Sequence, residues 1–149
     1  MKKKLITLVA AFILVSTAIF ANTAANPVPA FVESAFRQNF HHVTQVLWDS
    51  FGNYYKATVS DKSITMYVFY SENAELMGMG RNVLSDRLPE VLQSEIKSRF
   101  QEYWITDLVQ YRVADKNGYL ITVENADKKF VLKSEDNQHW QIYSKENKI

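Results

Sequence analysis

The chain has 149 residues and no cysteine, which excludes disulfide bonds, thiol nucleophiles and thiolate metal sites. Its 17 basic and 16 acidic residues give a formal net charge of +1, so no strong basic field points to nucleic acid as a partner. Low counts of glycine (4) and proline (3), together with 13% aromatic residues, indicate a folded chain rather than a disordered one.

Residues 1–21 have the pattern of a signal peptide. Three lysines precede an apolar stretch, residues 5–20, which ends near small residues. This stretch has 16 residues, short for a membrane-spanning helix of about 20, so export is favoured over a retained anchor. We expect cleavage after Ala21, with Ala25 as a second possible site. The mature chain would carry 14 basic and 16 acidic residues, with no membrane insertion, in the periplasm or outside the cell.

Two proline-led segments predict amphipathic helices. Pro29 and Pro89 each stand where a first helical turn tolerates proline, because the amide there has no helical partner. The apolar stripes at helical spacing are Val32, Phe36 and Phe40 in the first helix and Leu92, Ile96 and Phe100 in the second.

Alternating apolar and polar residues predict four strands after each helix. The expected strands are 46–48, 54–59, 64–70 and 75–79 in the first half and 105–113, 119–124, 130–133 and 139–143 in the second. The turn signals between them include 52–53, 61–62, 72–74, 115–118 and 125–127. Connections this short require antiparallel neighbours. The expected fold class is α+β, an eight-stranded antiparallel sheet with two helices packed on one face.

The two halves also resemble each other in sequence. Segment 28–40 recurs as 88–100 at an offset of 60 residues, and an offset of 64 pairs Tyr55 with Tyr119 and Val59 with Val123. Two copies are too few for an open repeat array. We therefore predict a single domain over residues 22–149, built of two repeats at 28–80 and 88–143 and joined by a short linker.

The order of these motifs resembles a known family. The match consists of Val28-Pro29, Phe36, Phe40, Val46-Leu47-Trp48, Gly52-Asn53-Tyr54-Tyr55 and Glu72-Asn73-Ala74 in the first half, and Leu88-Pro89, Ile96, Phe100, Gly118-Tyr119 and Asp136-Asn137 in the second. The chain is similar to the exported PepSY-like proteins described as β-lactamase-inhibitor-like (BLIP-like). That resemblance implies a tandem helix-plus-four-strand fold, a periplasmic location and no established catalysis. Ala74 stands where the family's turn usually has glycine.

Strand alternation separates two sides of the predicted sheet. Residues paired at the offset of 64 would face the helices, and the other side would carry Tyr54, Lys56, Tyr67 and Phe69. Aromatic side chains on an otherwise polar side would form an exposed patch, and such patches mark binding surfaces. These four residues are the candidate binding site.

The polar residues do not form a catalytic or metal-binding pattern. His41 and His42 are adjacent, which points their side chains in different directions, and His139 is distant in sequence. Ser34 and Ser94 have no histidine placed to activate them. No enzyme activity, cofactor or metal is therefore expected. The three tryptophans, Trp48, Trp104 and Trp140, are expected in the core.

The sequence supports two functional hypotheses. The first is an exported, non-enzymatic binding module that holds a protein or peptide of the cell envelope on the open sheet face, with inhibition as one form of that binding. The alternative is a carrier of a small ligand or an envelope glycan that uses the same face. Neither hypothesis involves nucleic acid.

Overall fold

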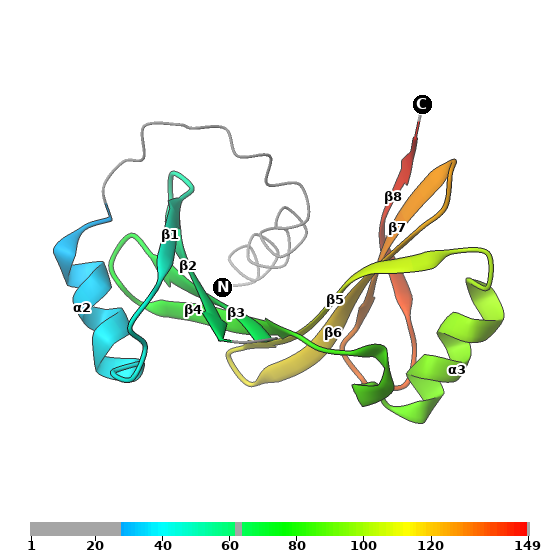
Figure 1. The fold of residues 1–149 in the computed structure, drawn as a ribbon, viewed down its shortest axis with the longest axis horizontal. Coiled ribbons are helices and arrows are strands. Elements are labelled where there is room, and N and C mark those ends of the chain that lie inside the picture. Colours follow the sequence, from blue (N-terminus) through cyan, green and yellow to red (C-terminus); the bar gives the residue numbers. More distant parts are fainter. Residues whose placement is uncertain (1–27, 62–63, 149) are drawn as a thin grey trace. The chain divides into compact units, whose positions relative to one another are not determined.

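The computed structural model describes residues 28–61 and 64–148, so the predicted signal peptide and part of the predicted turn at 61–62 lie outside the described residues. The chain forms two compact units, the first ending at Arg81 and the second beginning at Asn82 (Figure 1). The first contains α2 (Ala30–Asn39), β1 (Leu47–Ser50), β2 (Tyr54–Asp61), β3 (Ile64–Ser71) and all but the last residue of β4 (Leu76–Asn82). The second contains η2 (Ser85–Arg87), α3 (Glu90–Arg99), β5 (Trp104–Val113), β6 (Lys116–Glu124), β7 (Lys128–Ser134) and β8 (Gln141–Asn147).

The strands form one antiparallel sheet in the order β1 to β8, so neighbours in sequence are neighbours in the sheet. This confirms the predicted fold class of eight antiparallel strands with two helices. Each unit has one α-helix followed by four strands, while the internal repeat itself stays a prediction. No helix among the described residues is long and apolar enough to cross a membrane.

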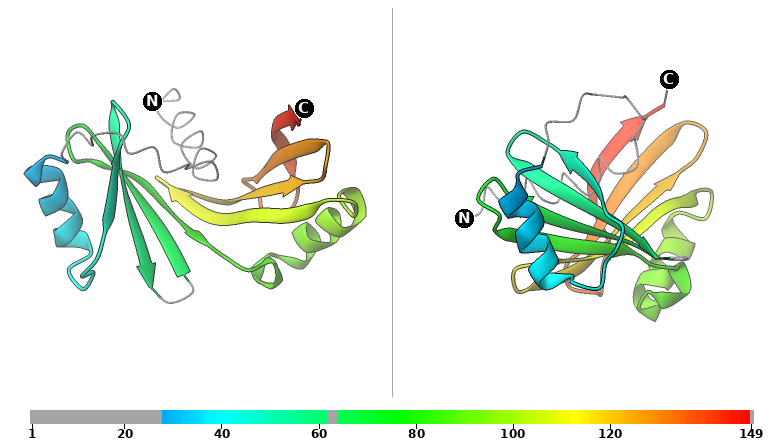
Figure 2. Two further views of the ribbon diagram at one scale, coloured as in Figure 1. Left: turned by 45° about the horizontal axis from the view of Figure 1, so that its top comes forward. Right: turned by 60° about the vertical axis from the view of Figure 1, so that its left-hand side comes forward.

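In the first unit, α2 packs on one side of its own strands, as Figures 1 and 2 show. Val32 and Phe36 are fully buried on the inner face of the helix, as its apolar stripe predicts. The strand residues beneath them are Ala57, Val68 and Tyr70. The helix ends where the backbone N–H of Phe40 bonds the carbonyl of Phe36 and the chain leaves helical geometry.

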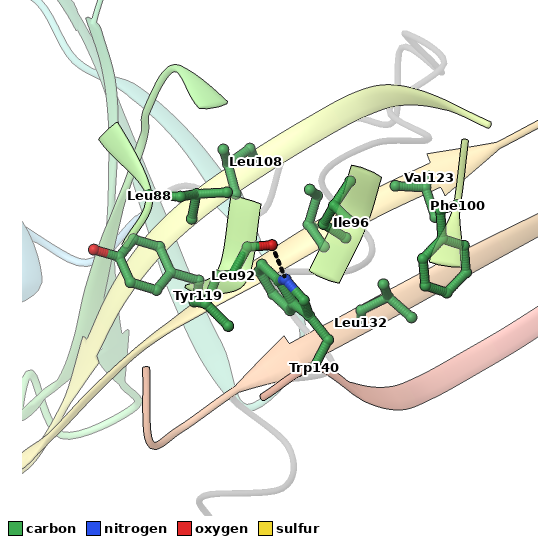
Figure 3. Close-up of a cluster of buried hydrophobic side chains, with 10 residues drawn as sticks. Leu88, Leu92, Ile96, Phe100, Leu108, Tyr119, Val123, Leu132 and Trp140 are labelled. Carbon is green, nitrogen blue, oxygen red and sulfur yellow. Dashed lines mark hydrogen bonds between the residues drawn. The ribbon is translucent and has the colours of Figure 1, made fainter. Parts of the chain in front are cut away.

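The second unit has its own core beneath α3 (Figure 3). Leu92 and Ile96 of the helix pack against Ile121, Val123 and Leu132 of the strands. Complete burial of side chains of this size stabilises a fold by about 1.5–3 kcal/mol each.

Trp140 packs in this second core. Its indole Nε1 donates a 3.0 Å hydrogen bond to the carbonyl oxygen of Leu92, the dashed line in Figure 3. The prediction that Trp140 is a core residue is confirmed, because 3% of the side chain is exposed. Trp48 is partly buried against Phe36. The prediction for Trp104 was wrong: it begins β5 and is 52% exposed.

Some boundaries differ from those predicted by alternation. The turn expected at 115–118 consists of Ala114 and Asp115 alone, since β5 ends at Val113 and β6 begins at Lys116. Gly118 is therefore a strand residue opposite Tyr111. A Cβ at Gly118 would lie 2.3 Å from the backbone oxygen of Ser134, so close packing accounts for the glycine.

Three non-glycine residues in hairpin turns adopt left-handed backbone conformations, and one of them is Ala114, with φ +51° between β5 and β6. Ala74 has φ +60° between β3 and β4, and Asn137 has φ +59° between β7 and β8. Asparagine tolerates this region better than alanine because its short polar side chain can hydrogen-bond locally. Ala74 thus has a conformation that favours glycine, the residue usual at this turn in the family that the sequence resembles.

Candidate binding face

The four predicted site residues lie on one side of β2 and β3, facing away from α2. The β2–β3 register places Lys56 opposite Phe69 and Thr58 opposite Tyr67. The intervening residues, such as Ala57 and Val68, belong to the core beneath α2. Successive strand residues point to opposite faces, so the four residues lie on the side away from this core. The structure thus agrees with the predicted assignment of sides. We call this side of the first unit the candidate face.

The predicted exposure of the aromatic residues was wrong. Phe69 is fully buried, and the exposed fractions of Tyr54 and Tyr67 are 7% and 8%. Neighbouring rings cover one another: the ring of Phe51 stacks on that of Tyr54 at 4.9 Å, and Tyr54 lies 6.1 Å from Phe69. Alternation indicates which side of a strand a residue occupies, but it does not show how far neighbouring side chains cover it.

An ion pair between a buried lysine and a half-exposed aspartate lies among these rings. The ammonium of Lys56 is 2.7 Å from a carboxylate oxygen of Asp49, and the two residues are direct partners in the β1–β2 register. The Lys56 side chain is 7% exposed, whereas that of Asp49 is 50% exposed. The lysine nitrogen also lies 5.3 Å from the centre of the Phe51 ring, within range of a cation–π interaction.

Asp49 and Phe51 belong to the candidate face but were not predicted to do so. Alternation could have found Asp49, because its neighbour Trp48 faces the core beneath α2. Phe51 follows the end of β1 and has no strand periodicity to place it. With 37% of its surface exposed, Phe51 is the most accessible aromatic ring of the cluster with Tyr54 and Phe69.

Burial and a nearby carboxylate both disfavour ionisation of Tyr54. Burial raises the pKa of its hydroxyl, and the nearby charge of Asp49 raises that pKa further. The phenol therefore remains protonated at physiological pH and can donate a hydrogen bond.

Two glycines of β4 complete the candidate face. Gly78 lies opposite Phe69 and Gly80 opposite Tyr67 in the β3–β4 register, and both glycines are buried. An aromatic side chain beside a strand glycine can cover the backbone that the glycine leaves bare. The spacing Gly78-Met79-Gly80 thus corresponds to alternate positions on the same side as Tyr67 and Phe69.

The second unit repeats this combination of charge and aromatic ring on the side of its strands away from α3. Lys133 forms an ion pair with Glu135, and its ammonium lies 6.0 Å from the ring centre of Tyr111. Burial is the main cause that raises the pKa of Tyr111, and Glu135 adds to it. The apolar and weakly polar residues buried on this side include Val109, Val113, Leu120, Thr122 and Val131.

The histidines show no metal-binding arrangement. The rings of His41 and His42 are 3.9 Å apart, and neither is brought to a cluster of carboxylates. Within residues 28–61 and 64–148, no group of three or more His, Cys, Asp or Glu side chains is placed to hold a metal ion.

Comparison with known proteins identifies solved structures of the same fold. A DUF2874 family protein from Bacteroides ovatus has a TM-score of 0.69 and 18% identity, covering 83% of this chain and 89% of its own. A BLIP-like protein from Bacteroides fragilis has a TM-score of 0.67 and 18% identity, covering 85% and 90%. A Bacteroides eggerthii protein, whose name proposes a periplasmic location, has a TM-score of 0.71 and 13% identity, covering 82% and 90%.

These neighbours show a BLIP-like fold for this chain and, at such low identities, the fold alone. No family model matches the sequence, and no curated protein matches it. The BLIP-like fold implied by the sequence resemblance is thus confirmed, while the tandem repeat and the likeness to PepSY proteins stay predictions.

Proposed function

We propose that this protein is an exported binding module that holds a protein or peptide of the cell envelope on the candidate face and catalyses no reaction. The BLIP-like fold of its structural neighbours supports the proposal, as does a neighbour whose name proposes a periplasmic location. The apolar segment at residues 5–20 supports export.

The observation that carries this proposal is the Lys56–Asp49 pair among aromatic rings. Removing an ammonium from water costs several kcal/mol, and well-packed apolar side chains in place of such a pair often stabilise a fold as well or better. An ion pair with one buried and one half-exposed member adds little to the stability of the fold. Its exposed member remains available to bind a partner. Asp49 presents its exposed carboxylate beside the accessible ring of Phe51.

This arrangement indicates the chemistry of the partner. The Asp49 carboxylate can accept hydrogen bonds from a lysine or arginine of the partner, and the Phe51 ring offers apolar contact next to it. Rigid aromatic side chains on a sheet provide contact area at a small cost in conformational entropy. We therefore expect a partner segment in which a basic residue adjoins an apolar one.

The test is recovery of the partner from an envelope extract with single charge-reversal variants. Asp49→Lys changes the candidate face, and Glu33→Lys makes the same change in charge on the exposed surface of α2. We expect one partner to be recovered by the wild type and by Glu33→Lys but lost with Asp49→Lys, while circular dichroism shows all three proteins folded. Equal recovery by both variants would refute the proposed face.

The carrier alternative makes a different prediction in the same preparation. A small molecule or glycan fragment that binds the native state raises the melting temperature in proportion to the logarithm of its concentration above Kd. We expect no such shift across a panel of small ligands and a shift with the recovered partner. A β-lactamase inhibition assay is a further direct check, and we expect no inhibition, because likeness of fold does not carry activity.

A further inference from the structure

The last strand of the sheet, β8, has an open edge. It stands at the end of the strand order and, within the described chain, pairs only with β7. All seven of its residues are exposed. An edge strand presents a row of backbone N–H and C=O groups with which another extended chain can pair.

The opposite edge strand, β1, is a poorer template. It has four residues, and the chain turns directly after it at Phe51–Asn53. Short edge strands are one way in which proteins limit such pairing. By contrast, β8 has seven residues, contains no proline, and carries exposed Ile142 (55%) and Tyr143 (37%).

The side chains of β8 on the α3 side include no acidic residue: they are Ile142, Lys145 and Asn147. Ile142 lies opposite Leu132 and Lys145 opposite Phe130, both of which pack in the core beneath α3. The Lys145 ammonium lies 5.7 Å from the centre of the Phe130 ring.

Lys128 adds a second positive charge on the same side, because it pairs with Asn147 in the β7–β8 register. Among the described residues, neither Lys128 nor Lys145 forms an ion pair. The edge therefore presents two ammonium groups whose charge is not neutralised by a carboxylate of the described chain.

We propose that the open edge of β8 binds an extended segment of another protein that carries acidic side chains on the α3 side of the added strand. Backbone hydrogen bonds to β8 would hold the segment, and Lys128 and Lys145 would select its charge. This surface belongs to the second unit and does not depend on the face proposed in the first.

A second copy of this chain fits the edge less well. When two antiparallel strands extend one continuous sheet, each residue keeps to its own side of that sheet. Lys145 of one copy would then meet only Ile142, Asn147 or Lys145 of the other. The acidic residue of β8, Glu146, pairs with Lys129 on the opposite side and is out of reach.

The test uses the purified, isotope-labelled protein and a short capped peptide in which glutamate and valine alternate. We expect the peptide to shift the amide resonances of Gln141–Asn147. A matched peptide with lysine in place of glutamate should bind about fivefold more weakly, the scale of two exposed charge pairs. The double variant Lys128→Glu/Lys145→Glu should reverse this preference. The control Arg87→Glu/Lys97→Glu changes two exposed charges of the same unit and should not.

A third peptide, with the glutamate sequence and N-methyl groups on its central residues, keeps the charges and lacks the backbone donors. We expect it to lose binding, because strand addition requires those donors. Equal binding of the lysine peptide or of the N-methylated peptide would overturn the proposal. So would shifts outside β8, or β8 shifts that depend on protein concentration without peptide, which would indicate a second copy at this edge.

Discussion

Two residues of the first unit have features that lower the stability of the fold when taken alone. Ala74 has a left-handed backbone, and Lys56 is a nearly buried cation. Each feature has a definite energetic cost in isolation, and each is placed by the register of the strands around it. These costs can be measured by substitutions that remove one feature at a time.

Ala74→Gly should stabilise the protein by up to about 1 kcal/mol. The left-handed conformation costs a residue with a Cβ about 1–2 kcal/mol, and the greater freedom of glycine in the unfolded chain offsets part of that gain. Ala126→Gly is the matched control, because Ala126 lies in the β6–β7 turn without a positive φ. Urea denaturation should show opposite signs for the two variants, and a loss of stability in both would contradict the account.

The Lys56–Asp49 pair should respond unequally to removal of its two members. Asp49→Ala leaves a buried ammonium without its carboxylate, and we expect a loss of about 1–3 kcal/mol, below the cost for a fully buried pair because Asp49 is half exposed. Lys56→Met leaves Asp49 free to be solvated and fills the same space, so the change should be small or stabilising. Chemical denaturation of both variants checks this, and an equal loss in both would be inconsistent with a costly buried charge.

At the scale of elements, the segment between β7 and β8 is anchored to α3 rather than extended as a strand. The backbone N–H of Trp140 bonds Glu95 at 3.0 Å, its carbonyl accepts from Arg99 at 3.2 Å, and its indole bonds Leu92. These contacts explain why β8 begins at Gln141 and not at 139 as predicted. The strand continues to Asn147 through exposed polar residues, for which hydrophobic alternation gives no signal.

Trp140→Phe should cost about 2 kcal/mol. The substitution removes the indole donor, leaves the Leu92 carbonyl without this partner in the core, and reduces packing volume. Trp104→Phe makes the same chemical change at a side chain that is 52% exposed, so its effect should be within about 0.5 kcal/mol. Thermal denaturation, monitored by circular dichroism, compares the stabilities of the two variants. Similar losses of stability would contradict the role of the Trp140–Leu92 hydrogen bond.

Acid should weaken the second unit through the turn before Trp140. Backbone N–H groups of Gln138 and His139 donate to Asp136 and hold its pKa below the ordinary value. Salt bridges likewise lower the pKa of Glu124 and Glu135. A carboxyl with a lowered pKa contributes stability that is present above its unfolded value, about 4, and is lost as pH falls through its folded value.

Asp136→Ala should therefore reduce stability more at pH 6 than at pH 3. In urea titrations, the difference between wild type and variant should shrink as the pH falls. A difference that stays constant, or grows in acid, would show that Asp136 acts through something other than its charge.

For the whole molecule, the sequence was sufficient to predict the class of fold and the sides of most strands. Helical spacing placed Phe36 and Ile96 on the buried faces of their helices, and alternation placed Lys56 and Phe69 together on the other side of the sheet. The confirmed fold class, eight antiparallel strands with two helices, follows from that periodicity and from short antiparallel connections. Helical spacing and strand alternation can each be recognised within a few neighbouring residues, so the sequence alone was enough to predict these features.

The burial of the aromatic side chains on the candidate face could not be predicted from local sequence patterns. The burial of Phe69 depends on contacts between side chains that are distant in sequence, and the exposure of Trp104 depends on its place as the first residue of β5. The Asp49–Lys56 pair requires the β1–β2 register, which the turn at Gly52-Asn53 suggests only within one residue. A shift of one residue would have exchanged the two sides of the sheet.

The central claim, that the candidate face holds an envelope partner, is tested most directly by photo-crosslinking in living cells. A photoreactive phenylalanine analogue replaces either Phe51, at the candidate face, or Phe31, which is 55% exposed on α2. We predict a discrete crosslinked product from position 51 and none from position 31. A product at position 31 alone, or no product at position 51 when the protein is folded and exported, would contradict the account.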